Sequence, residues 1–237
     1  LIVVVSIKYL LLIMRQNNEG EGGIIALVAL LQPLSRRKRW GARLLIPLGI
    51  FGAALLYGDG TITPAISVMS AMEGLSASNE ALEPWVLPLT VTILVALFVM
   101  QRQGTHRIGA LYGPIMLVWF LTIGALGVRG IAMHPDILLA ANPAHGAAFF
   151  QANQLAGFLV LGTVFLVVTG GEALYADLGH FGLSPIRRAW FFAVLPALVL
   201  NYFGQGALIL KDASEAAHPF FHLAPDWAIY PLVALAT

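Results

Sequence analysis

Residues Leu55–Leu75, LLYGDGTITPAISVMSAMEGL, carry an aspartate inside a hydrophobic run long enough to cross a membrane. A carboxylate at that depth costs about 3 kcal/mol on insertion scales, so such residues are usually kept for function. Read as a helix, the run places an acid and three hydroxyls on one stripe, at i, i+4, i+8 and i+11: Asp59, Thr63, Ser67 and Ser70. This row of oxygen ligands predicts a cation site. For Ser70, hydrogen bonding to a neighbouring helix is the better interpretation.

The composition is that of a membrane protein. Hydrophobic residues make up 59% of the chain, charged residues 11%, and the mean hydropathy is +0.83, whereas a soluble domain carries about 25% charged residues. The net charge of +1 offers no basic surface for nucleic acid. The absence of cysteine excludes disulfides, thiolate metal sites and thiol catalysis. Because the sequence begins and ends within unfinished hydrophobic segments, we expect a piece of a longer protein.

Hydrophobic runs near the roughly 20 residues that cross a bilayer predict six membrane spans and a C-terminal stub. Arg and Lys gather in alternate loops, above all at Arg36–Arg39, whereas the loop 76–85 has none. By the positive-inside rule, the first of these loops is cytoplasmic and the second lies outside. The expected bounds of the spans and the stub are 1–31, 44–75, 86–100, 108–128, 155–175, 189–210 and 229–237.

Two of these spans contain residues that weaken a helix. Glycines and a proline at 58–64 interrupt the second span, and the pair Gly170-Gly171 separates Thr169 from Glu172 in the fifth. Each glycine costs a helix about 1 kcal/mol, so we expect a break or kink at both places. In transporters, interrupted spans free backbone carbonyls to coordinate ions near the midplane. Glu172 is therefore a second candidate for an acid at an ion site.

Other chemistry is disfavoured. His134 and His145 have no third metal ligand at helical spacing. The glycine-rich stretch Asn17–Gly23 lacks the lysine and hydroxyl of a phosphate-binding loop and is interpreted as a tight turn. No nucleophile stands beside a base, so we expect neither an enzyme nor a cofactor.

The longest motifs are similar to those of the KUP/HAK/KT family of potassium uptake transporters. The resemblance rests mainly on YGDGTITPAISVMSAMEGL at Tyr57–Leu75 and VTGGEALYADLGHFG at Val168–Gly182. SIKYLLLIMRQNNEGEGGI at Ser6–Ile24 supports it, as do LNYFGQGALIL and HPFFHLAPDW further along. It covers the whole sequence.

The resemblance implies an all-α membrane protein with a truncated LeuT-like fold of the APC superfamily, containing discontinuous or kinked helices. The sequence would begin inside the second helix of that fold and stop inside the eighth. It would therefore lack the first helix, whose Gly-Asp-Ile-Gly-Thr-Ser-Pro motif supplies another acid, and could not be expected to transport alone. The implied activity is potassium uptake together with protons, across the cell (cytoplasmic) membrane. The implied partners are potassium, protons and membrane lipid, with a homodimer left open.

By the same resemblance, Asp59, Thr63 and Ser67 fall at an ion site on the third helix, and Thr169 and Glu172 at one on the sixth. Neutral oxygens suit potassium because they replace its water without holding it too tightly. A carboxyl group removed from water takes up a proton more readily, so Glu172 and Asp59 are the candidates for proton coupling.

Two alternatives remain open from the residues. A potassium channel is disfavoured because the sequence contains no TVGYG-like filter. An amino acid permease is disfavoured because such proteins bind the substrate carboxylate with helix N-termini, so an acid such as Asp59 is not required.

Overall fold

The computed structural model describes the backbone of residues 1–36, 40–101 and 106–237, and the side chains of residues 1–30, 45–100 and 112–237. The described residues are nearly all helical, as expected for an all-α membrane protein. Several basic residues behind the predicted orientation lie outside the described side chains: Arg36, Arg37, Lys38, Arg39, Arg43, Arg102 and Arg107.

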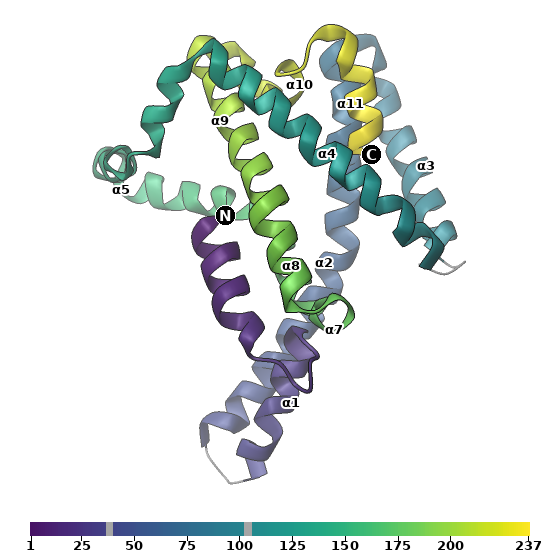
Figure 1. Ribbon diagram of the computed structural model, residues 1–237, viewed down its shortest axis with the longest axis vertical. Coiled ribbons are helices and arrows are strands. Elements are labelled where there is room, and N and C mark those ends of the chain that lie inside the picture. Colours follow the sequence, from purple (N-terminus) through teal and green to yellow (C-terminus); the bar gives the residue numbers. More distant parts are fainter. Residues whose placement is uncertain (37–39, 102–105) are drawn as a thin grey trace. The chain divides into compact units, whose positions relative to one another are not determined.

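The chain forms two compact units. The first comprises Leu1–Asp59 and Asn142–Phe192, and the second comprises Gly60–Ala141 and Ala193–Thr237. The first unit contains the π-helix η1 (Ile2–Leu12), η2 (Ile13–Arg15), α1 (Gly23–Arg36), the first part of α2 (Trp40–Ser78), α5 (Pro143–Leu166), α6 (Gly171–Ala176), α7 (Leu178–Phe181), α8 (Leu183–Ala189) and the start of η5 (Trp190–Val194) (Figure 1).

Between η2 and α1 the chain makes the tight turn expected from its glycines. Asn18 and Glu21 exchange two backbone hydrogen bonds of 2.9 and 3.0 Å. The two residues between them both have positive φ, 55° at Glu19 and 93° at Gly20. That pair of angles is the pattern of a type I′ turn. Residues 1–31, expected as one span, are therefore divided into two helical segments.

The helix α2 is continuous across the stretch in which a break was expected. Every residue from Trp40 to Ser78 is α-helical, including Gly58, Gly60 and Pro64. In an apolar medium each unmade backbone hydrogen bond costs several kcal/mol, whereas a glycine costs a helix only about 1 kcal/mol. The expected break at 58–64 is therefore wrong.

Two interruptions occur within α5 and directly after it. Within α5, Gln154 has φ 43° and ψ −118°, which bends the helix just before the apolar stretch that was expected to span from residue 155. The second interruption follows Leu166, where residues 167–170 form turns, and Gly170 has φ 86°. A left-handed angle at that position favours glycine. The break predicted from the glycine pair is confirmed.

The second unit contains the rest of α2, η3 (Glu80–Leu82), α3 (Glu83–Gln101), α4 (His106–Met133), η4 (Pro135–Ala141), α9 (Leu195–Lys211), η6 (Ala213–Ala217), α10 (Pro219–His222), η7 (Asp226–Ala228) and α11 (Ile229–Ala236). Its apolar core joins the end of α2 to α10 and α11 through Val68, Met72, Phe221, Ala224, Ile229, Leu232 and Val233.

Helices α4 and α9 pack with their backbones in close approach (Figure 1). A Cβ added at Gly127 would lie 2.3 Å from the carbonyl carbon of Leu200, and one at Gly130 would lie 2.7 Å from the Cα of Gly204. The buried Asn201 side chain donates to the Ile123 carbonyl across this contact, at 3.3 Å. Small residues and polar bridges of this kind hold helices together in membranes, where apolar burial gives little driving force.

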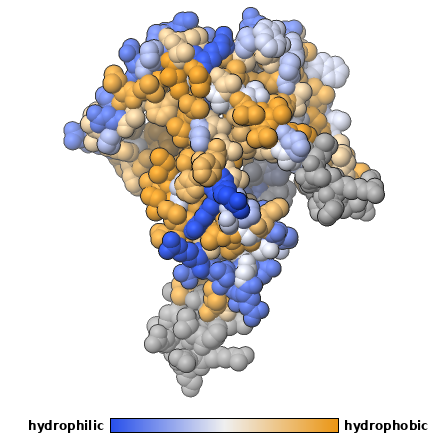
Figure 2. All heavy atoms as spheres, viewed as in Figure 1, coloured by the Kyte–Doolittle hydropathy of each residue, from blue (hydrophilic) through white to orange (hydrophobic). Residues whose placement is uncertain are grey.

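Five helical segments are long and apolar enough to cross a membrane. They are Leu45–Ser78, Glu80–Met100, Tyr112–Met133, Pro143–Leu166 and Leu183–Lys211. In each segment, at most 28% of the 18-residue stretch of high hydropathy is buried within the structure. Figure 2 shows such apolar side chains over much of the face in view. Outward-facing apolar surface on this scale is what a lipid or membrane-protein environment accommodates.

Candidate functional site

A cavity of about 390 Å³ lies within the first unit and is lined by η1, α1, α2 and α6. Most of its lining is apolar or glycine, contributed by α1 and α2. Its polar lining residues are Lys8, Tyr9, Asp59, Glu172 and Tyr175. Two carboxylates from distant parts of the sequence therefore share one mainly apolar cavity.

Hydrogen bonds from three side chains tie the N-terminal segment to the segment that carries Glu172. Trp190 donates its indole N–H to the Ser6 hydroxyl at 2.9 Å, and both residues are buried. Arg187 donates to the carbonyl of Leu10, with its Nε at 3.0 Å. The Tyr175 hydroxyl donates to the carbonyl of Gln16. These bonds hold η1 and η2 against the α6–η5 segment, which fixes one wall of the cavity.

Glu172 is positioned by the glycine pair before it. Gly170 ends the turn with its left-handed angle, and α6 begins at Gly171. A Cβ at Gly171 would lie 3.5 Å from Val5 and 3.6 Å from the Tyr9 ring, so α6 starts directly on η1. The partly buried Glu172 occupies the first turn of α6. An acid there is favoured by the positive end of the helix dipole.

The turn after η2 packs equally closely on α6. A Cβ added at Gly22 would lie 2.0 Å from the carbonyl oxygen of Tyr175. Only a glycine allows the two backbones to approach to this distance.

The structure brings together two of the five residues proposed to bind the ion. Asp59 and Glu172 both line the cavity, and Asp59 is partly buried. Thr169 is exposed in the turn before α6 and is absent from the cavity lining. Thr63 and Ser67 follow on α2 in the second unit, where Ser67 lines a different cavity of about 640 Å³ together with Ser70 and Gln205.

Sequence reasoning missed Lys8, Tyr9 and Tyr175. The signal for Lys8 was present, because a lysine inside the apolar run LIVVVSIKYLLLIM is as unusual as the acid at Asp59. The two tyrosines gave no signal of their own, since aromatic residues are common in membrane helices. That Tyr9 and Tyr175 line one cavity follows only from the packing of η1 against α6, two segments remote in sequence.

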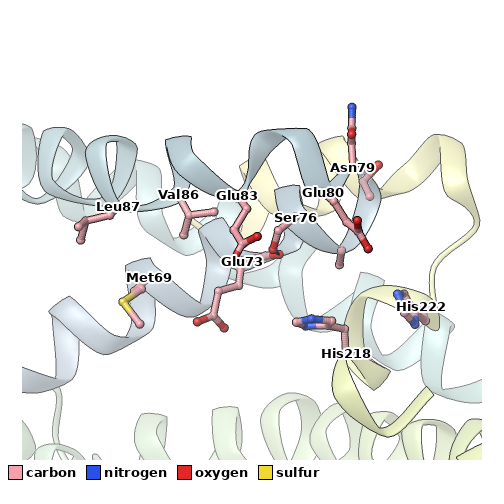
Figure 3. A pocket seen from close by; sticks show the side chains of 12 residues that line it. Met69, Glu73, Ser76, Asn79, Glu80, Glu83, Val86, Leu87, His218 and His222 are labelled. Carbon is pink, nitrogen blue, oxygen red and sulfur yellow. Dashed lines mark hydrogen bonds between the residues drawn. The ribbon is translucent and has the colours of Figure 1, made fainter. Parts of the chain in front are cut away.

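A larger cavity of about 910 Å³ lies in the second unit, at the junction of α2, η3 and α3 with α10. Figure 3 shows Glu73, Glu80 and Glu83 around it with His218 and His222. His222 hydrogen-bonds to Glu215. Within the part of the chain that the structure describes, no group of three or more His, Cys, Asp or Glu side chains is arranged to hold a metal ion.

Beyond the end of α9, Asp212 caps η6. Its exposed carboxylate accepts hydrogen bonds from the Ser214 amide at 2.9 Å and the Ser214 hydroxyl at 2.7 Å. These bonds lower the pKa of the Asp212 carboxyl below its ordinary value. Asp212 is thus a structural acid that requires no functional role.

A family model described as the K+ potassium transporter integral membrane domain matches residues 1–237, the whole chain. The chain belongs to this family. It is 60% identical over its full length to the probable potassium transport system protein Kup 1 of Geobacter sulfurreducens. It is also 59% identical to the probable potassium transport system protein Kup of Myxococcus xanthus and 58% identical to that of Thiobacillus denitrificans. No solved structure matches the chain.

Membership confirms the resemblance to the potassium uptake family and identifies the chain as part of a multi-pass integral membrane domain. It also agrees with the expectation that the chain is not an enzyme, because the family is one of transporters. The chain spans 38% of the length of the Geobacter relative and 37% of the Myxococcus relative.

Proposed function

We propose that this chain is part of a secondary active transporter that takes up potassium across the cytoplasmic membrane together with protons. The observation that carries the proposal is the cavity shared by Asp59 and Glu172, in a chain whose whole length matches a potassium transporter family. The proposed setting is a LeuT-like fold, in which interrupted helices surround an ion site near the midplane. The helix break before Glu172 supports that setting.

The proposed potassium ligands are Asp59 and Glu172, completed by the hydroxyls of Thr63, Ser67 and Thr169. On α2, Thr63 and Ser67 follow Asp59 at i+4 and i+8, so helical periodicity puts all three on one side of the helix. Hydroxyl and carboxylate oxygens suit an alkali cation. A mixture of neutral oxygens and few full charges allows an ion to be bound and still released.

The coupled proton is proposed to reside on Glu172, or to be shared between Glu172 and Asp59. Two carboxyls lining one cavity influence each other's protonation, so their protons belong to the pair. Inward movement of one positive charge gains about 2.3 kcal/mol per 100 mV of membrane potential. A cotransported proton adds to this driving force and permits uptake from dilute potassium.

The other proposed partners follow from the setting. Membrane lipid is expected to contact the outward-facing apolar side chains, and a homodimer is compatible with them. Neither a cofactor nor a nucleic-acid partner is part of the proposal. An amino acid permease or a potassium channel is not favoured by any of the relatives' names.

The proposal is tested with a full-length transporter that carries this chain, purified into liposomes. Rubidium uptake is measured with and without an inward proton gradient, and labelled amino acids are offered in parallel. Saturable rubidium uptake stimulated by the proton gradient is the expected result. Amino acid uptake without rubidium uptake would contradict the proposal. Rubidium uptake at the same rate with and without the proton gradient would indicate a channel or a uniporter.

A further inference from the structure

Lys8 is a charged residue in an apolar helix and lines the cavity that contains Asp59 and Glu172. Lys8 belongs to the segment that the sequence predicts as the first span, and a lysine in a spanning segment usually faces a protein interior or a water-filled path, where it pairs with other charges. The mechanism proposed above makes no use of it. Among the residues that line the cavity, Lys8, Asp59 and Glu172 are the ones that carry a formal charge.

We propose that Lys8 is a tethered cation that sets the charge of the ion site. Two ionised carboxylates and one ammonium leave a single negative charge in the cavity, which one monovalent cation neutralises. Lys8 would then favour the binding of one monovalent ion over two ions or a divalent one. This inference rests on the proposed function, and it adds a residue that determines ion affinity at the same site.

The position of Lys8 is fixed by bonds on both sides of it. Two residues before it, the Ser6 hydroxyl accepts from buried Trp190, and two residues after it, the Leu10 carbonyl accepts from Arg187. The adjacent residue Tyr9 contacts the start of α6 beside Glu172. The backbone of Lys8 is therefore held against the segment that carries Glu172.

The Lys8 side chain is exposed, and its ammonium has a local contact with the neighbouring residue Tyr9. Its Nζ lies 5.0 Å from the centroid of the Tyr9 ring, within the range of a cation–π interaction. Tyr9 lines the same cavity. The alternative is that Lys8 extends its ammonium to the membrane surface and only its stem packs against the protein. In that case removing its charge would leave the ion site unchanged.

The charge-setting role predicts the sign of two changes. Without the ammonium, the carboxylates attract a cation more strongly, so potassium should bind more tightly and leave more slowly.

The test compares Lys8→Gln with the charge-preserving control Lys8→Arg in the full-length transporter in liposomes. For Lys8→Gln we expect the half-saturation concentration for rubidium to fall at least about fivefold, as removal of a nearby like charge predicts. Its maximal rate should fall, because the more tightly bound ion leaves more slowly. Lys8→Arg should stay within about twofold of wild type, because it keeps the charge.

A charge-restoring double variant separates this role from a structural one. Lys8→Gln combined with Glu172→Gln recovers the original net charge of the cavity, so the double variant should bind rubidium more tightly than Glu172→Gln alone. Wild-type affinity in Lys8→Gln would overturn the inference and leave the proposed function standing. Should Lys8→Gln fail to fold, Lys8→Met serves in its place, and failure of both single variants to fold would assign Lys8 a structural role and overturn the inference. Absence of rubidium uptake by the wild type would overturn both proposals.

Discussion

At the scale of single residues, the central finding is that Asp59 and Glu172 line one cavity although they stand far apart in the sequence. An acid is unusual in a membrane-spanning helix such as the one that carries Asp59. Under the proposed function, the charge of the pair would change with bound cations and protons. The predictions at this scale concern the two carboxylates separately.

Asp59→Asn removes one full charge from the proposed potassium site while preserving the size of the side chain. We expect rubidium uptake by the full-length transporter to fall at least about tenfold, because a charged ligand contributes more than about 1.4 kcal/mol at a partly buried site. Uptake is measured at equal protein amount. Asp177→Asn is the matched control, since Asp177 is exposed and does not line the cavity. Wild-type affinity and rate in Asp59→Asn would remove Asp59 from the site.

Glu172→Gln fixes the side chain in a form that resembles its protonated state. We expect it to lose the stimulation of uptake by acid and to move no protons with potassium, while it still binds rubidium. The measurement is lumenal acidification in liposomes during potassium entry. Glu19→Gln, an exposed acid in the turn before α1, should behave as wild type. Acidification that persists in Glu172→Gln would assign the proton to another group.

At the scale of elements, the close contact between α4 and α9 is the feature of the second unit that depends most on particular side chains. Gly127 and Gly204 allow the two backbones to touch, and Asn201 bridges the helices. Gln205 donates in turn to the Asn201 side chain. Asn201 thus acts through helix packing, and Gln205 is its hydrogen-bond partner within α9.

Gly127→Ala should disturb this contact, because the added Cβ would lie 2.3 Å from the backbone of Leu200. Overpacking of this kind typically costs about 1–3 kcal/mol. We expect a lower melting temperature of the full-length transporter in detergent. Gly113→Ala on the same helix is the control, since an added Cβ there meets no atom within 4 Å. If both variants melt at the same temperature, the two helices do not depend on this close approach.

At the scale of the whole molecule, the arrangement of charged loops predicts how the chain crosses the membrane. The loop 76–85 contains acids and no Lys or Arg, whereas Arg187 and Arg188 precede α9. The positive-inside rule therefore assigns η3 to the outer side and α8 to the cytoplasmic side. This orientation is open to a direct chemical test because the chain contains no cysteine.

Single cysteines introduced at exposed positions should report the orientation. We expect Ala81→Cys, in η3, to react with a membrane-impermeant maleimide added to intact cells, with any cysteine elsewhere in the full-length transporter replaced. Ser184→Cys, in α8, should react only after the membrane is opened. Both residues are exposed, so a difference in labelling reflects the side of the membrane. Labelling of Ser184→Cys in intact cells would reverse the assigned orientation.

The sequence by itself determined the membrane class, the family and the helix break before Glu172. These depend on quantities that are local along the chain: mean hydropathy, uninterrupted motifs and the conformational freedom of Gly170. The same local reasoning was wrong at 58–64, where α2 continues. The hydrogen bonds of a continuous helix outweigh the small cost of its glycines in an apolar medium.

Only the tertiary structure decided which polar residues share a cavity. Asp59 and Glu172 line one cavity because bonds such as those of Trp190 to Ser6 and Arg187 to Leu10 hold η1 near the segment that carries Glu172, while α2 packs closely on α1 at Gly52. The same packing adds Lys8 to the lining and leaves out Thr169. Periodicity along a single helix identifies residues on a common face, but the partner that this face meets depends on contacts between segments remote in sequence. That is the physical reason why the acids could be chosen from the sequence and their cavity could not.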